Sequence, residues 1–357
     1  LDVVWQIWGL ISTEYVDKQA IDSKKLRQGA IKGMLEALKD PYTSYLDRDN
    51  AVLEFSDLQG KFEGIGAHVG MKDNQLIVIA PIPDAPAEKA GIRAGDAILE
   101  VDGQPTAGLS LQEAVIKIRG PKGTAVALRV RHEGQAGTES ITIVRAEIQV
   151  KSVRWQPKGD IAYIQITHFS GDTSRELRRV LGEVSSQGLK GIALDLRTNP
   201  GGLLAEVVAV ASQFLKEGDT VLSVVNNKGE RQEMKASAGG QATEMPLVVL
   251  VDSHSASGSE VLAGALRDQG RAMVLGTKTF GKGSVNVLFP LKDGSVLYLT
   301  TSRWRTPKGL PIEGKGLVPD VEIVTKAEER AEGKDPALDR ALDYLRSRQA
   351  VGQPSGG

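Results

Sequence analysis

The sequence has no cysteine among its 357 residues. Disulfide bonds, a thiolate nucleophile and cysteine-ligated metals are therefore excluded. Histidine is also scarce, at four residues, and no HExxH pattern marks a zinc peptidase. No run of about 18 apolar residues predicts a membrane-spanning helix. With a net charge of -1 and a pI near 6.5, the chain carries no excess positive charge that would attract nucleic acid.

Glycine, in contrast, is abundant, at 40 residues, so tight turns and loops should be numerous. Hydrophobic residues make up 41% of the chain and charged residues 25%, which is typical of a folded protein. The length is sufficient for two domains.

Two helix patterns occupy the N-terminal region. Residues 1–16 and 23–38 each place apolar side chains at the spacing of one helix face. The second pattern ends at Asp40-Pro41, because proline disfavours helix at the residue before it. Three interpretations stay open: the helices form a lid, they cap the core, or they form an exposed dimer arm, which predicts concentration-dependent association.

Residues 58–147 have the pattern of a separate module, in which short strands alternate with turns and one helix covers 110–119. The loop Gly64-Ile65-Gly66-Ala67 precedes the first long strand. A glycine loop beside an edge strand and a helix can hold a peptide carboxylate on backbone N–H groups while the peptide adds as a strand. A small β domain without a ligand is the alternative.

From Lys151 onward, strand and helix patterns alternate, which predicts a largely parallel sheet covered by helices. Functional loops are expected at the carboxyl ends of its strands. Residues 285–288 and 296–300, separated by Asp293-Gly294, predict a hairpin. A last helix is expected at 337–348.

One strand–helix–strand unit brings a serine and a lysine together. The apolar run 247–250 precedes Ser257, and a helix pattern then carries the chain roughly 18 Å away. A strand at 272–276 returns it by roughly 16 Å. Lys282 therefore comes back to the helix start, beside Ser257. Lysine can accept a proton from serine when its amine is neutral, and burial favours the neutral amine.

An acyl-transfer site also needs donors for an oxyanion. The N–H of Gly258 follows the serine at a helix start, and the turn with Gly201 and Gly202 follows a neighbouring strand. These three glycines are the candidate oxyanion hole. An ordinary strand-to-helix turn is the alternative for the second element.

The same region permits two other interpretations. His254 lies three residues before Ser257 and could act as a base, although Asp252 is the only evident carboxylate partner. The segment from Gly276 to Lys282 fits GxxxxGK, yet Gly283 stands where a phosphate loop has serine or threonine. The serine–lysine interpretation explains more of the pattern.

Two stretches carry a family resemblance. The glycine loop and residues 86–103, Pro-Ala-Glu-Lys-Ala-Gly-Ile-Arg-Ala-Gly-Asp-Ala-Ile-Leu-Glu-Val-Asp-Gly, resemble a PDZ domain. The segments 194–202, 255–260 and 279–283, together with Asp40 to Leu46, resemble the carboxyl-terminal processing proteases. The resemblance covers nearly the whole chain. It implies a serine endopeptidase with a Ser/Lys dyad and no cofactor or metal.

The resemblance implies a role for each candidate residue. Ser257 would be the nucleophile and Lys282 the general base. The peptide's carboxyl terminus, with an apolar last residue, would bind at the Gly64–Ala67 loop and against the helix at 110–119. Arg119, at the end of that helix, is a candidate for coupling peptide docking to the core. The family commonly has glutamine four residues after the lysine; here that position is Asn286, one methylene shorter.

The predicted fold is a multidomain α/β protein: a βα-alternating, crotonase-like protease core with an inserted PDZ domain and N-terminal helices. The expected parts are residues 1–57, the PDZ domain 58–147, the core 148–350 and a disordered tail 351–357. The resemblance further implies an extracytoplasmic enzyme, a homodimer built through terminal helices, and membrane association only through a segment outside this sequence. A catalytically silent scaffold or chaperone that binds protein carboxyl termini is the second interpretation.

Overall fold

A computed structural model describes residues 2–48, 51, 61–72, 75–82, 84–109, 111–149, 151–324 and 334–351. The chain divides into two compact units: Leu1–Ala51 with Asn286–Thr301, and Val52–Val285 with Ser302–Gly357. The predicted disordered tail lies outside the described residues, apart from Val351 at the end of the last helix.

The N-terminal unit begins with two helices, α1 (Asp2–Glu14) and α2 (Ser23–Glu36). Asp22 caps α2, accepting hydrogen bonds of 2.9 and 3.1 Å from the amides of Lys24 and Lys25. Strand β1 (Ser44–Leu46) pairs antiparallel with the first residues of β18 (Val296–Arg305). The hairpin predicted around Asp293-Gly294 joins β17 (Ser284–Pro290) to β18.

Helix α1 buries none of its residues. Its apolar side chains are largely exposed, with Trp5 at 70% and Ile7 at 51%. Across the described residues, no helix combines the length and the apolar character that crossing a bilayer would require.

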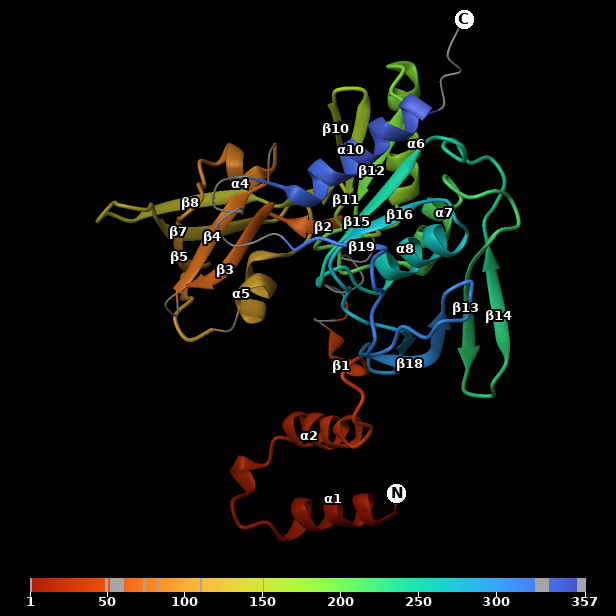
Figure 1. The fold of residues 1–357 in the computed structure, drawn as a ribbon. Helices are drawn as coiled ribbons and strands as arrows, with labels where there is room; N and C mark the ends of the chain where they lie inside the picture. The colour runs from red at the N-terminus through yellow and green to blue at the C-terminus, as the bar shows by residue number, and fades with distance from the viewer. Residues whose placement is uncertain are drawn as a thin grey trace, which may run out of the picture. The chain divides into compact units, whose positions relative to one another are not determined.

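The module predicted at residues 58–147 is built on short antiparallel strands (Figure 1). Its main sheet has the order β3-β4-β5-β7-β8, with all pairs antiparallel. The bounds are β2 Lys61–Gly64, β3 Ala67–Lys72, β4 Gln75–Pro81, α4 Pro86–Lys89, β5 Ala97–Val101, β6 Gln104–Pro105, α5 Leu111–Ile118, β7 Ala125–Arg131, β8 Glu139–Val144 and β9 Ala146–Gln149. Strand β7 alternates buried and exposed residues, so one sheet face packs on a small apolar core.

The core sheet has the order β10-β11-β12-β15-β16-β19, and every pair except the edge pair β10–β11 is parallel. The largely parallel sheet predicted from the sequence is confirmed. Its bounds are β10 Val153–Lys158, β11 Ile161–Ile166, β12 Gly191–Asp195, β15 Leu247–Val251, β16 Met273–Gly276 and β19 Val321–Glu322.

Helices cover both faces of this sheet (Figure 1). Helices α6 (Thr173–Ser186), α7 (Leu204–Ala211) and α8 (Gly258–Asp268) share one apolar core with it, and α10 (Pro336–Val351) packs on the other face. Strands β12 and β15 are buried along their whole length, which explains their continuous apolar sequences. A hairpin of β13 (Thr220–Asn226) and β14 (Arg231–Lys235) pairs with the second half of β18.

Candidate active site

Ser257 lies at the turn between β15 and α8. Its backbone has φ 51° and ψ -111°, a conformation that is unfavourable for a residue with a side chain. Such strain is commonly found at functional sites, where the surrounding structure imposes it. The turn leaves the serine half-buried at the start of a helix whose first residues are fully buried.

A buried carboxylate, Glu260, ties this turn to the lysine segment. Its Oε2 accepts hydrogen bonds from the amide of Ser257 at 2.8 Å and from the amide of Lys282 at 2.9 Å. The two amide nitrogens therefore lie within about 6 Å of each other. The structure brings the predicted serine and lysine together through a residue to which the sequence interpretation gave no role.

Glu260 makes two further bonds through Oε1, from the hydroxyl of Thr279 at 2.5 Å and the amide of Gly281 at 2.7 Å. Burial raises the pKa of the Glu260 carboxyl, while the four donors act in the opposite direction. All four partners donate to this side chain, an arrangement that suits an ionised carboxylate. The spacing Ser-x-x-Glu, known from helix capping boxes, could have indicated this link from the sequence.

The turn with Gly201 and Gly202, the second candidate oxyanion element, packs directly against Ser257. A Cβ placed on Gly201 would lie 2.8 Å from both the amide nitrogen of Gly258 and the Cβ of Ser257, so only glycine fits. The amide of Gly201 donates to Oδ1 of Asn199 at 2.8 Å. Gly202 forms a parallel bridge with Phe169 that uses the Gly201 carbonyl and the Leu203 amide. The N–H of Gly202 therefore points away from Phe169.

Asn286 lies in β17, in the N-terminal unit. Its Nδ2 donates to the carbonyl of Tyr42 and to the hydroxyl of Thr300, both at 2.9 Å. Both N–H donors of the amide are thus used within that unit, and among the described atoms its buried Oδ1 has no partner. Its role in orienting Lys282 stays a prediction.

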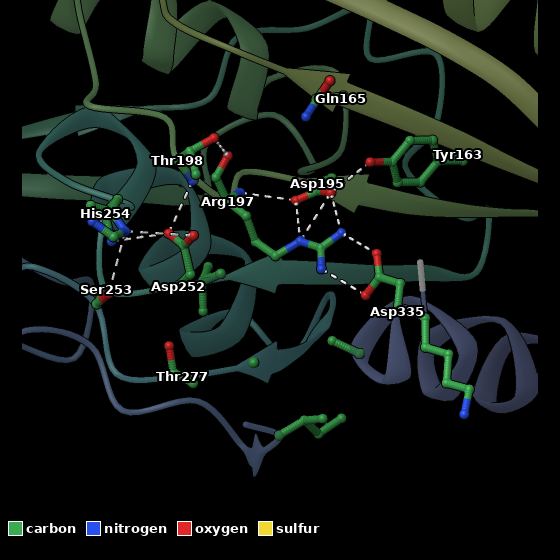
Figure 2. Close-up of a pocket in the computed structure, with 15 residues that line it drawn as sticks. Tyr163, Gln165, Asp195, Arg197, Thr198, Asp252, Ser253, His254, Thr277 and Asp335 are labelled. Carbon is green, nitrogen blue, oxygen red and sulfur yellow. Dashed lines mark hydrogen bonds and ion pairs between the residues drawn. The ribbon is translucent and has the colours of Figure 1, made fainter. Parts of the chain in front are cut away.

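A separate cavity of about 580 Å³ opens at the carboxyl ends of β11, β12, β15 and β16 (Figure 2). His254, the alternative base, lines this cavity with a side chain that is 76% exposed. Its Nδ1 lies 3.9 Å from Asp252, beyond hydrogen-bonding distance. The segment after Lys282 continues into strand β17 and not into a helix, which is incompatible with a phosphate loop.

Arg197 dominates the wall of this cavity, between Asp195 and Asp335 (Figure 2). Its Nη2 lies 2.7 Å from a carboxylate oxygen of each aspartate. Burial acts to lower the pKa of Arg197, but the two aspartates outweigh it and raise that pKa. Burial likewise opposes the shift at Asp335, where the arginine lowers the pKa. Asp335 also accepts from the amide of Leu338, so the start of α10 is fixed to the end of β12. The sequence interpretation gave this network no role.

The candidate peptide groove of the module is a cavity of about 250 Å³. It is lined by Phe62, Ile65, Gly66, Ala67, His68, Val69, Val115, Ile118 and Arg119, which include four of the five predicted peptide-binding residues. The fifth, Gly64, packs against Arg119, whose guanidinium lies 4.6 Å from the ring centre of Phe62.

The backbone of the glycine loop is held from one side. The carbonyls of Ile65 and Gly66 accept hydrogen bonds of 2.7 and 2.9 Å from the amides of Ala87 and Ile82. Because C=O and N–H point in opposite directions in a trans peptide, the amides of Gly66 and Ala67 point away from those partners. Position 66 requires glycine, because its φ is 75° and a Cβ there would collide with the side chain of Ala85.

The chain is similar to known proteins along most of its length. Residues 160–323 match the model of peptidase family S41, residues 54–131 the PDZ domain, and residues 1–50 the N-terminal domain of the activating protease CtpB. The carboxy-terminal-processing protease of Bartonella bacilliformis is 38% identical over 98% of this chain and 81% of its own length. A CtpA-like serine protease of Staphylococcus aureus is 42% identical over 91% of this chain, which spans 65% of that relative.

The chain is also similar in fold to a protease of known structure. The photosystem II D1 C-terminal processing protease is 30% identical, with a TM-score of 0.54 over 89% of this chain and 92% of that one.

Proposed function

The chain belongs to the carboxy-terminal-processing proteases of peptidase family S41, and we propose that it cleaves protein substrates with a Ser257/Lys282 dyad after its PDZ domain has bound their carboxyl termini. The observation that carries the dyad is the bridge through Glu260, which bonds the amides of both residues. Membership of a peptidase family supports this proposal over a catalytically silent scaffold or chaperone.

In the proposed reaction, the amine of Lys282 takes the proton of the Ser257 hydroxyl as Oγ attacks the substrate carbonyl. The lysine then donates this proton to the leaving amine, which departs and leaves an ester on Ser257. The same amine then deprotonates a water molecule, whose oxygen attacks the ester carbonyl. The lysine returns this proton to Oγ of Ser257 as the ester C–O bond breaks and the second product leaves. No metal or cofactor takes part in these steps.

The amides of Gly258 and Gly202 are the proposed oxyanion donors. Gly258 begins helix α8, so its N–H has no intrahelical acceptor and lies at the positive end of the helix dipole. Gly201 was also predicted as a donor, but its amide is bonded to Asn199. Its contribution is the missing side chain, which lets the turn approach Ser257.

The PDZ groove is proposed to bind a free carboxylate on the Gly66 and Ala67 amides, with the apolar last side chain against Ile65 and Val115. Arg119 stays a candidate for coupling this event to the core. The crotonase-like relation of the core and an extracytoplasmic location are also proposals, which rest on the family resemblance.

The groove can be tested separately from the dyad. Val115→Glu places a negative charge in the groove and should raise KM at least about tenfold for a peptide with a free apolar carboxyl terminus, by repelling its carboxylate. An amidated version of the peptide should already have the high KM with the unmodified enzyme. Steady-state kinetics on both peptides provide the measurement. Lys117→Ala, on the exposed side of the same helix, changes the net charge equally and should leave KM unchanged. Equal KM values for the free and amidated peptides would contradict the proposed recognition.

A homodimer through the N-terminal helices is supported by the exposed apolar face of α1, which includes Val4, Trp5 and Ile7. We expect sedimentation velocity to show association that increases with protein concentration. Trp5→Glu should shift the equilibrium toward monomer, because it places a charge in the apolar contact. A monomer at all concentrations up to about the millimolar range would contradict the proposal.

A further inference from the structure

Lys282 lies in a segment whose own sequence does little to fix the direction of the lysine side chain. It is bracketed by Gly281 and Gly283 and belongs to neither a helix nor a strand. The glycines are needed because the turn from Ile312 to Gly316 packs against them: a Cβ on Gly281 would lie 2.9 Å from the Gly316 amide, and one on Gly283 would lie 2.6 Å from the Glu313 amide. Glycine provides no rotational restraint, so partners outside the segment must orient the lysine.

The peptide plane before Lys282 is held on both sides. The carbonyl of Gly281 accepts from the amide of Gly314 at 2.9 Å. On the opposite side, the amide of Lys282 donates to Glu260 at 2.9 Å. This plane cannot rotate without breaking one of these bonds.

The peptide plane after Lys282 is held in the same way by different residues. Its carbonyl, that of Lys282, accepts from the indole Nε1 of Trp304 at 2.9 Å. Its amide, that of Gly283, donates to Oε2 of Glu313 at 2.8 Å. The amide of Trp304 also donates to the carbonyl of Gly283 at 2.9 Å, and the side chain is only 3% exposed.

We propose that Trp304 is a positioning residue for the general base: its indole N–H holds the Lys282 carbonyl and so fixes the direction in which the lysine side chain leaves the backbone. Two held planes determine φ and ψ of Lys282, and these determine the direction of the Cα–Cβ bond. A lysine amine lies about 6 Å from its Cα, so a small rotation at the backbone displaces the amine by a large part of an ångström. The inference rests on the proposed role of Lys282.

The test is Trp304→Phe, which keeps an aromatic ring in the buried site and removes only the indole donor. We expect kcat for peptide cleavage to fall about tenfold while KM stays within about twofold, because the substrate groove is unchanged and the base is displaced. The rate of labelling by a fluorophosphonate probe should fall by a similar factor. That probe reacts with an activated serine and needs no peptide recognition.

Trp155→Phe is a matched control. The indole of Trp155 also donates one hydrogen bond of 2.9 Å, to Glu183, and it packs on the same apolar core. It should lower the melting temperature by an amount similar to Trp304→Phe and leave kcat unchanged. Equal kcat values in the two variants would overturn the inference. It would also be overturned if the fall in kcat of Trp304→Phe were fully explained by a smaller fraction of folded protein.

The experiments distinguish a wrong assignment of Lys282 as the base from a wrong role for Trp304. If Lys282→Ala retains activity, the proposed base is wrong and Trp304 has nothing to position. If Lys282→Ala is inactive and Trp304→Phe is as active as Trp155→Phe, only the positioning role is wrong. Glu313→Gln provides a second variant on the same peptide plane, because the amide oxygen can still accept from Gly283. It should retain most of the activity, whereas Glu313→Ala should lower kcat.

Discussion

Lys282→Ala should lower kcat/KM for a peptide with an apolar carboxyl terminus by at least about a thousandfold, while the protein stays folded. The alanine variant has no group that can take the proton of Ser257, and a serine hydroxyl is a poor nucleophile while it keeps that proton. Ser257→Ala should have an effect at least as large, because it removes the attacking oxygen. The two losses should not add in the double variant, since the two side chains act in one step.

Matched controls lie in the same two segments. Lys278 and Ser253 are exposed neighbours of the candidate residues. Lys278→Ala and Ser253→Ala should retain full activity, which would show that the effects are specific. Circular dichroism and thermal unfolding establish that each variant is folded. A Lys282→Ala enzyme with more than about one tenth of the original kcat would contradict the assignment of the base.

The sequence is informative where short-range patterns determine the outcome. The apolar run 247–250 and the alternation of strand and helix patterns from Lys151 onward predict the parallel sheet and its covering helices, because burial of continuous or periodic apolar residues has few other solutions. The same patterns place Ser257 and the turn at Gly201 at the carboxyl ends of neighbouring strands, and the close packing of these two sites agrees with that expectation.

Local sequence patterns do not predict the contacts between distant segments of the chain. Trp304 reaches Lys282 from β18, and Asp335 reaches Arg197 across more than a hundred residues. Nothing in the local sequence of either residue indicates its partner. The second half of β18 was likewise missed, since Trp304 is the only apolar residue in 301–305 and the hydrogen bonds to β13 hold this segment in the sheet. Residues that orient the candidate site are therefore harder to predict than the residues that react.

Glu260→Gln is expected to have the second largest effect, a loss of kcat of about a hundredfold or more. Each carboxylate oxygen of Glu260 accepts two hydrogen bonds. In glutamine one of these oxygens is replaced by an NH₂ group, which cannot accept, so two of the four hydrogen bonds are lost. Both the turn of Ser257 and the segment of Lys282 then lose a common anchor. Each buried donor left without a partner also costs about 1–3 kcal/mol of stability.

The matched control is Glu176→Gln. The Oε2 atom of Glu176 accepts from the amides of Ser152 and Val153 at 2.8 and 3.0 Å and from the hydroxyl of Ser152. Its replacement should leave kcat unchanged and lower the melting temperature less than Glu260→Gln does, because the amide oxygen of glutamine can still accept the bonds that hold the start of β10. If both glutamine variants lose activity in proportion to stability, Glu260 has only a structural role.

The pH dependence of stability offers an independent check on Glu260. Burial raises its pKa in the folded protein, so between the ordinary glutamate pKa of about 4.3 and the higher folded value the folded state binds more protons than the unfolded state. The free energy of unfolding that this group contributes therefore falls as pH rises through that window. Glu260→Gln has no such group, so the stability difference between the two proteins should narrow with rising pH. Denaturant unfolding at several pH values above 4 measures the difference in free energy of unfolding between the two proteins. A difference that stays constant with pH would mean that the Glu260 carboxyl has the same pKa in the folded and the unfolded state.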